Sequence, residues 1–490
     1  MSATHYLAVD LGAESGRVML GRLEDGRLSL DEVHRFANRV QKIEGHQHWD
    51  LDHLRREIFA GLEKAAATGT PIAGISADSW GVDYVLIDAE GQPLAAPFCY
   101  RDERTAESMS HYFQAVPRED VYAETGIQFM AINTLFQFEA ERRFNAAKLE
   151  KASQFLLIAD YFNEQLSGVK VAEESLASTT QIYNPVAKEW SRQLVGALGL
   201  APSLFPKIVP SGTVLGPVAG ELKAKPAFAN TKIIATCSHD TGAAVAAVPA
   251  RGGDTWAYLS SGTWSLIGAE LGEPVITDAA REAGFTNEIG LGGKVRFLKN
   301  LAGLWVLQEC RRAWEAEGQK FDYGMLTQLA TDNGPARAHL NLGDARFVSA
   351  GEMPRKIADF CRETAQPVPT TTGEYVRLIL ESLALTYARS LRTLEKLTAR
   401  RIDTLHIVGG GSQSLLLNQL SADATGCTVI TGPVEGTAIG NVLIQALALG
   451  QIESPAHLRR IVETSFPTQT YKPQAAFSAE TLARFQKLHD

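Results

Sequence analysis

Short apolar runs that end at aspartate, serine or glycine recur along the chain. One run, Tyr6–Val9, ends at Asp10, and another, Ile233–Ala235, leads into the polar segment Cys237–Ala243. Runs of this length, bounded by turn residues, are typical of strands inside a sheet. Further strands are predicted at residues 72–76, 82–88 and 405–408.

Helical patterns lie between and after these strands. Residues 375–398 carry apolar side chains at the spacing of one long helix packed on a sheet. Small residues from Gly242 to Val248 predict the start of another helix, and a third is expected from Ser412 onward, after the loop Gly409–Gly411. Alternating strands and helices predict an α/β fold.

The two halves of the chain open in the same way, with a strand, a glycine-rich turn and a returning strand. The first such segment is 6–20 and the second is 255–268. Backbone N–H groups in such turns can surround phosphate oxygens. The P-loop sequence is absent from both halves, so a different phosphate site is implied. Pro, Gly and charged residues cluster at 248–254, where we expect the domain boundary.

Composition limits the class of protein. A chain of 490 residues is too long for one hydrophobic core. Its net charge of −9 argues against a nucleic-acid or anionic-membrane partner, and no apolar run is long enough to cross a bilayer. The five cysteines form no Cys-x-x-Cys pair, and no signal peptide is indicated, so we expect a cytoplasmic protein without structural disulfides.

Asp240 is the first candidate for catalysis. It lies where a predicted strand gives way to a predicted helix, which is where α/β proteins present ligand-binding and catalytic groups. A carboxylate there can act as general base on a hydroxyl, the one proton transfer that a small-molecule kinase needs. The simpler alternative is that Asp240 only caps the helix. His239 can either position Asp240 or contact a substrate.

Four other residues stand out near the N-terminus. Asp83 interrupts an apolar segment, where a carboxylate needs a partner or a ligand. Trp80 is either core or the wall of a pocket. Arg17 follows a glycine-rich turn and is placed to meet phosphate charge, unless it is only a solvated strand residue. Asp10 ends the first strand and could hold Mg²⁺ through water.

Several motifs, taken in their order along the chain, resemble one known family, the FGGY carbohydrate kinases. The motifs are Asp10-x-Gly12…Gly16-Arg17, Trp80-Gly81-Val82-Asp83, Ser238-His239-Asp240-Thr241, Ser261-Gly262-Thr263-Trp264 and Gly409-Gly410-Gly411. The resemblance implies an α/β protein with two actin-like, RNase H-like domains flanking a catalytic cleft. It implies that residues 1–247 bind the sugar and residues 248–490 bind the nucleotide.

The resemblance also assigns roles. The substrates would be ATP, with Mg²⁺, and a small sugar. The stretches Tyr100-Arg101-Asp102 and Leu298-Lys299-Asn300 are typical of the members that phosphorylate L-rhamnulose on O1. Asp240 would be the base. The sugar would contact Trp80, Gly81, Asp83, His239, Thr241 and Asn300. The nucleotide would contact Ala13, Glu14, Ser15, Gly16, Arg17, Thr263, Gln308 and Gly410.

One position departs from the family pattern, and two alternatives stay open. Glu14 stands where the family leads us to expect a small polar residue, and its carboxylate would repel phosphate unless it faces solvent or pairs with a cation. The first alternative is another FGGY ketose kinase, acting on fuculose or xylulose. The second is a non-catalytic actin-fold protein that binds ATP, against which Asp240 and the pocket candidates argue. The sequence leaves the oligomeric state open.

Overall fold

The chain forms two compact units in the computed structural model, which describes residues 3–489. The first unit contains the chain up to 251 together with 270–297 and 436–465, and the second contains 252–269, 298–435 and the chain from 466 onward. The chain first passes from one unit to the other between residues 251 and 252, inside the predicted boundary segment 248–254. Because later segments return to the first unit, no single cut separates the two units.

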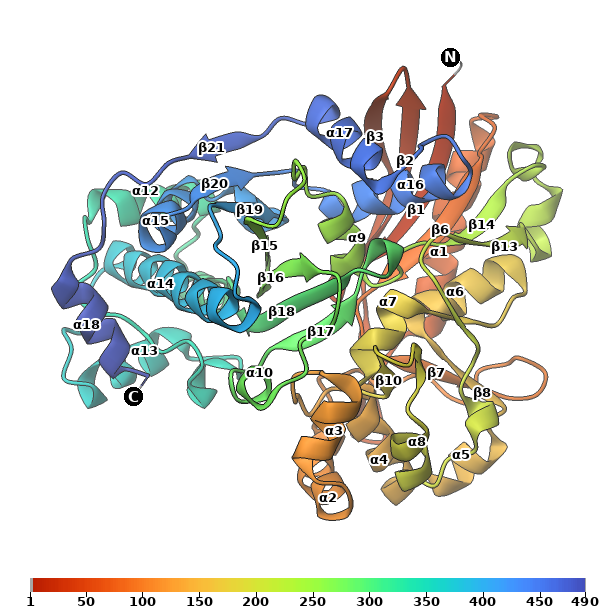
Figure 1. Ribbon diagram of the computed structural model, residues 1–490, viewed down its shortest axis with the longest axis horizontal. Coiled ribbons are helices and arrows are strands. Elements are labelled where there is room, and N and C mark those ends of the chain that lie inside the picture. Colours follow the sequence, from red (N-terminus) through yellow and green to blue (C-terminus); the bar gives the residue numbers. More distant parts are fainter. Residues whose placement is uncertain (1–2, 490) are drawn as a thin grey trace. The chain divides into compact units, whose positions relative to one another are not determined.

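The first unit is built on a six-stranded sheet (Figure 1). Its strands, in spatial order, are β13 (Thr213–Pro217), β14 (Lys232–Ala235), β6 (Gly74–Ser79), β1 (Thr4–Leu11), β2 (Ser15–Glu24) and β3 (Arg27–Ala37). Strands β14, β6 and β1 run parallel, while β1, β2 and β3 form an antiparallel meander. The carboxyl ends of the three parallel strands therefore meet at one edge of the sheet.

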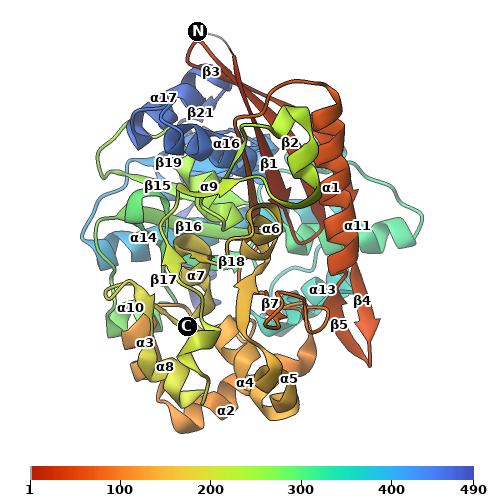
Figure 2. The same cartoon turned by 90° about the vertical axis from the view of Figure 1, so that its right-hand side faces the viewer.

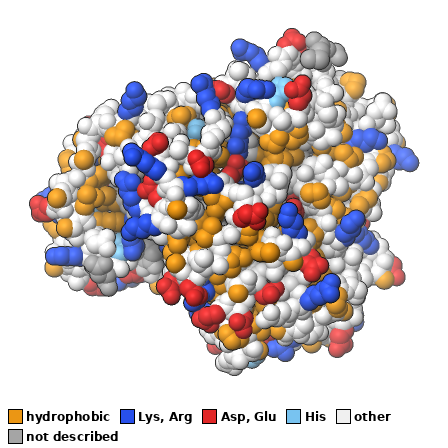
Figure 3. Space-filling view, viewed as in Figure 1, with side chains coloured by type: hydrophobic (Ala, Val, Ile, Leu, Met, Phe, Trp, Pro, Cys, Tyr) orange, Lys and Arg blue, Asp and Glu red, His pale blue; other side chains and the backbone are white. Residues whose placement is uncertain are grey.

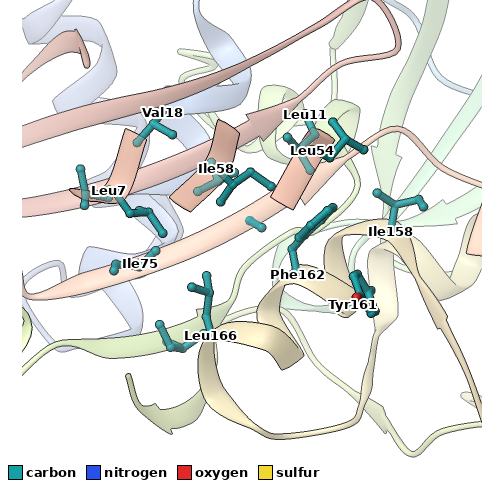
Figure 4. Packing of buried hydrophobic residues seen from close by; sticks show 14 of the residues in the cluster. Leu7, Leu11, Val18, Leu54, Ile58, Ile75, Ile158, Tyr161, Phe162 and Leu166 are labelled. Atoms are coloured by element: carbon teal, nitrogen blue, oxygen red, sulfur yellow. The ribbon is translucent and has the colours of Figure 1, made fainter. Parts of the chain in front are cut away.

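Helices cover both faces of this sheet. One face packs on α1 (Leu51–Ala67) and α6 (Ile158–Ser167), whose apolar side chains meet Leu7 and Ile75 in the cluster of Figure 4. The other face packs on α16 (Gly436–Ala448), from near the C-terminus, as Figures 1 and 2 show beside β1 and β2. Alternation of side chains along β1 sends Leu7 to the first face and Asp10 to the second.

The rest of the first unit consists of short elements. Its helices are α2 (Ser108–Ala115), α3 (Arg118–Thr125), α4 (Thr134–Phe144), α5 (Ala146–Lys151), α7 (Glu174–Ala177), α8 (Arg192–Ala197), α9 (Asp240–Ala246), α10 (Asp278–Glu282) and α17 (Pro455–Ser465). Its short strand pairs are β4 (Val40–Ile43) with β5 (His46–Trp49), β7 (Tyr84–Ile87) with β8 (Gln154–Leu157), β9 (Ala172–Glu173) with β12 (Ile208–Val209), and β10 (Tyr183–Asn184) with β11 (Glu189–Trp190).

The second sheet repeats the plan of the first, with an antiparallel hairpin followed by parallel neighbours. Its strand order is β17 (Thr286–Ile289), β18 (Val295–Ala302), β16 (Trp264–Leu271), β15 (Trp256–Ser261), β19 (Thr404–Val408), β20 (Thr428–Thr431) and β21 (Gln469–Tyr471). The helices of the second unit are α11 (Trp305–Ala316), α12 (Tyr323–Asp332), α13 (Met353–Glu363), α14 (Thr372–Thr398), α15 (Leu415–Thr425) and α18 (Ala479–Lys487). The shared plan matches the two similar openings seen in the sequence.

One predicted helix starts later than expected. The helix predicted from Ser412 begins at Leu415, because Gly410–Gln413 first form a 3-10 turn. Among the described residues, no helix is long and apolar enough to span a membrane. On the face drawn in Figure 3, basic and acidic side chains are interspersed.

Candidate functional site

Three aspartates lie where the three parallel strands of the first sheet end. Asp10 and Asp78 are register partners on β1 and β6, and Asp240 follows β14. A bridge between Ser79 and His239 ties the end of β6 to the residue before Asp240. This edge of a parallel sheet is where α/β proteins bind their ligands.

Asp240 is the first residue of α9, and His239 occupies the N-cap position. The Asp240 side chain is 27% exposed and accepts a hydrogen bond from the Thr241 N–H at 2.6 Å. Burial raises the pKa of Asp240 to about 6, the charge of Asp10 adds to the rise, and His239 opposes it. A reachable carboxylate with this pKa suits general-base chemistry near neutral pH.

Asp78 was not predicted from the sequence. It is fully buried, accepts a hydrogen bond from Asn441 on α16 at 2.5 Å, and its Oδ1 has no hydrogen-bond partner among the described residues. Burial raises the pKa of Asp78 well above its usual value, and the charges of Asp10 and Asp240 reinforce this. The protonated, uncharged form of Asp78 is therefore favoured relative to an exposed aspartate. The sequence feature that could have identified Asp78 is a carboxylate within the apolar strand Gly74–Ser79, as Asp10 is within β1.

The first hairpin turn is held by pairs of opposite charge. Arg17 forms an ion pair with Asp10. Glu14 is 61% exposed and forms an ion pair with Arg101 at 2.8 Å, so its carboxylate both faces solvent and has a cationic partner. Ala13 also lies in the turn, while Ser15, Gly16 and Arg17 belong to β2. Within residues 3–489, no group of three or more His, Cys, Asp or Glu residues is arranged to hold a metal ion.

Asp83 is fully buried, and its carboxylate is turned toward protein donors. It accepts hydrogen bonds from the indole N–H groups of Trp49 at 2.6 Å and Trp80 at 3.0 Å, from Gln137 at 2.9 Å and from the Tyr100 backbone at 3.1 Å. The two indole rings lie 4.5 Å apart. Asp83 thus holds two buried indole rings in place, and of the donors to it Trp80 and Tyr100 were named from the sequence.

The backbone beside these two indole rings is strained. Val82 has a φ of 67°, which a β-branched residue rarely adopts. The Thr179 hydroxyl accepts a hydrogen bond from the Val82 N–H at 3.2 Å, and the Thr134 hydroxyl donates one to the Val82 carbonyl at 2.6 Å. A side chain at Gly81 would lie 2.9–3.1 Å from Thr179. Strain held by its surroundings in this way is concentrated at functional sites in proteins.

His239 and Thr241 contact two charged residues that sequence reasoning missed. Arg296 on β18 and Glu288 on β17 are both buried, and both lie within hydrogen-bond distance of His239. The signal was again a charge within an apolar segment, since Arg296 is flanked by Val295 and Phe297.

The second unit brings together two residues predicted to bind the nucleotide. The Thr263 hydroxyl, in the turn between β15 and β16, lies 3.3 Å from Gln308 Oε1 on α11. Gly303 lies against the same turn, where a Cβ would be 2.5–2.7 Å from backbone atoms of 262–264. Gly410 has open space where a side chain would be. Asn300 lies on β18 within this unit.

The comparisons with known proteins agree with this architecture. Residues 5–247 match the N-terminal domain, and residues 257–449 the C-terminal domain, of the FGGY family of carbohydrate kinases. The chain belongs to this family.

Several curated relatives match nearly the whole chain. A rhamnulokinase of Bacteroides thetaiotaomicron is 42% identical over 470 residues, covering 96% of each chain. A rhamnulokinase of Lactiplantibacillus plantarum is 39% identical over 98% of this chain and 97% of its own, and that of Bacillus subtilis is 37% identical over 98% of each.

Solved structures share the fold at low identity. A xylulose kinase from Lactobacillus acidophilus has a TM-score of 0.80 at 17% identity, covering 99% of this chain and 96% of its own. Glycerol kinase of Plasmodium falciparum with ADP has a TM-score of 0.79 at 14% identity, covering 99% and 97%. The expected family and the two-domain α/β fold are confirmed.

Proposed function

We propose that this chain is an ATP-dependent kinase that transfers the γ-phosphoryl group of ATP to O1 of L-rhamnulose. The sugar assignment is supported by the full-length likeness to rhamnulokinases at 37–42% identity. The catalytic assignment is carried by Asp240, a partly exposed carboxylate at a strand end with a pKa of about 6.

Asp240 would take the proton from the sugar hydroxyl as the hydroxyl oxygen attacks the γ-phosphorus. Phosphoryl transfer asks little covalent chemistry of the protein, so positioning and charge stabilisation supply most of the rate. Thr241 and His239 lie next to this carboxylate and would bind neighbouring hydroxyl groups of the sugar. Trp80 would pack its ring on the sugar, while Asp83 would act by holding Trp80 in place.

Most of the residues predicted to contact the nucleotide lie in the two hairpins, one in each unit. The turn from Ala13 to Arg17 and the Thr263–Gln308 pair supply backbone and side-chain donors for phosphate oxygens, and Gly410 leaves room for close approach. Mg²⁺, when bound with ATP, neutralises phosphate charge. Because Mg²⁺ keeps several waters and needs only one or two carboxylates, Asp10 fits such a role through water.

We also place the protein in the cytoplasm. All five cysteines are buried and free, and a reducing compartment keeps thiols in this state.

The direct test is ADP release with a panel of ketoses. L-Rhamnulose is expected to give the highest kcat/KM, above L-fuculose and xylulose, and ³¹P NMR should identify a 1-phosphate. The Asp240→Asn variant is the control for protein-catalysed transfer. A higher kcat/KM for fuculose or xylulose would reassign the sugar, and no ketose-dependent ADP release would refute the proposal.

A further inference from the structure

Arg296 is the most unusual buried side chain near the candidate base. Its side chain is fully buried, and charged side chains are almost never fully buried without partners. Its Nη2 donates to Glu288 Oε2 at 2.9 Å and to His239 Nδ1 at 3.0 Å. Its Nη1 donates to the Thr241 hydroxyl at 3.2 Å, and its Nε donates to the Ile289 carbonyl at 3.2 Å.

These contacts restrict the protonation of His239. A guanidinium can only donate hydrogen bonds, so the contact between Arg296 Nη2 and Nδ1 is a hydrogen bond when Nδ1 carries no proton. In the neutral ring the proton is then on Nε2. That nitrogen lies 3.4 Å from Asp240 Oδ1 and 3.1 Å from the Thr241 hydroxyl. His239 therefore presents a donor to the candidate base.

Glu288 balances the charge of Arg296 and stabilises it in the interior. Burial alone would raise the pKa of Glu288, but Arg296 and His239 hold it below its usual value. The same Oε2 lies 3.2 Å from His239 Nδ1 and would accept from an Nδ1–H group, but it already accepts the shorter hydrogen bond from Arg296 at 2.9 Å. The charged groups around His239 are thus Asp240 on one side and Glu288 with Arg296 on the other.

Arg296 acts on Thr241 in a similar way. The Thr241 oxygen accepts from the guanidinium, which leaves the hydroxyl proton to be donated elsewhere. A hydroxyl proton directed away from Arg296 suits an oxygen of a bound sugar.

We propose that Glu288 and Arg296 are positioning residues of the sugar site, which fix the Nε2–H tautomer of His239 beside Asp240 and turn the Thr241 hydroxyl into a donor. The proposal rests on the function proposed above for Asp240. Arg296 acts through His239 and Thr241, and Glu288 acts through His239 and Arg296. This explains why two opposite charges are retained in the interior of the first unit.

The tautomer can be measured directly on the full-length protein. Long-range ¹H–¹⁵N NMR of ¹⁵N-histidine-labelled protein distinguishes the two neutral tautomers, and loss of one signal in His239→Gln assigns that residue among the 11 histidines. We expect Nε2–H in the wild type and a mixture of tautomers in Arg296→Met. An Nδ1–H tautomer in the wild type would overturn the proposal.

Kinetics give the second readout. Arg296→Met and Glu288→Gln should lower kcat by about 10- to 100-fold, the usual effect of losing a group that orients an active side chain, and leave KM for ATP within about twofold. Arg296→Lys, which keeps the charge, should recover part of kcat. The matched control is Glu381→Gln, which alters a buried Glu381–His339–Arg377 cluster in the second unit and should keep kcat.

The outcomes separate this proposal from the proposed function. If the Arg296 variants do not fold, the tautomer of His239 in the wild type and the kcat of Glu288→Gln still test the positioning role. Folded Glu288→Gln and Arg296→Met proteins with wild-type kcat would refute the positioning role. If the wild type shows no ketose-dependent ADP release, the proposed function fails, whereas the tautomer of His239 remains measurable and is unaffected by that result.

Discussion

Asp10 and Arg17 face each other across the first hairpin as register partners, and their side chains form an ion pair. The cation next to the predicted phosphate turn is therefore already engaged by a carboxylate. A phosphate group that binds there must share Arg17 with Asp10. The pair also brings a positive charge to the edge of the sheet where Asp78 and Asp240 lie.

Replacing the candidate base by its amide should abolish most of the activity. Asp240→Asn keeps the shape of the side chain but cannot accept a proton, so kcat should fall by about 10²-fold or more, the usual contribution of general-base catalysis. Calorimetry should show unchanged ATP affinity, and the thermal midpoint should stay close to that of the wild type. Near-normal turnover in the folded variant would remove Asp240 from the mechanism.

The rate should depend on the ionisation of Asp240. Because its pKa is raised to about 6 and the base must be ionised, kcat should be independent of pH well above 6 and fall about tenfold per pH unit below it. A pH profile at saturating substrates measures this.

Histidines commonly titrate in the same range, so the profile needs a control. The His239→Gln variant should be slower but should keep an acid limb. Disappearance of the limb in that variant would assign it to His239 instead.

Asp83 should stabilise the first unit in a pH-dependent way. Burial raises its pKa to about 6 in the folded state, from an ordinary value of 3.8. The folded state thus binds the proton more tightly than the unfolded state. The contribution of Asp83 to stability is full below the unfolded pKa and is lost as pH rises through about 6.

Asp83→Asn removes this titration and turns an amide N–H₂ group toward donors. We expect the variant to lose about 1–3 kcal/mol of unfolding free energy, because buried donors lose their acceptor. Urea unfolding at pH 4.5 and pH 7 should show a larger gap between wild type and variant at pH 4.5. An equal or larger gap at pH 7 would contradict the expected direction of the pH dependence.

Gly303 should be essential for the shape of the Thr263 turn. A Cβ there would lie 2.5–2.7 Å from backbone atoms of 262–264, so Gly303→Ala must displace the turn. We expect a loss of about 1–3 kcal/mol from overpacking and a raised KM for ATP. Gly272→Ala is the control, since nothing lies within 4 Å of its Cβ. Unchanged ATP kinetics in Gly303→Ala would separate this turn from nucleotide binding.

The local pattern of the chain predicted both hairpins, several further strands and three helices, but fewer than half of the elements in the structure. The strand 233–235, the helix 375–398 and both hairpins are present because their apolar periodicity is strong. The return of residues 436–465 to the first unit was not foreseeable, since nothing in an amphipathic helix states which sheet it will cover.

The site was predicted unevenly for a similar reason. Asp240 and Thr263 lie at turns, where the sequence marks strand ends. Arg296, Glu288 and Asp78 lie inside strands and act through partners far away in sequence. Asp83 precedes β7, and its apolar neighbours showed that it needs a partner but not that Trp49 and Trp80 supply it.

The close contact between α16 and α9 bears on how the protein is made. A Cβ on Gly440 would lie 1.9 Å from the Ala243 carbonyl oxygen, so the two helices touch backbone to backbone, and α16 also covers β1. A ribosome delivers β1 more than 400 residues before it delivers α16. During synthesis, one face of the first sheet is therefore uncovered while the whole middle of the chain emerges. The nascent chain has to keep that face from aggregating until its last layer arrives, so the first unit completes its folding after most of the second unit has been translated.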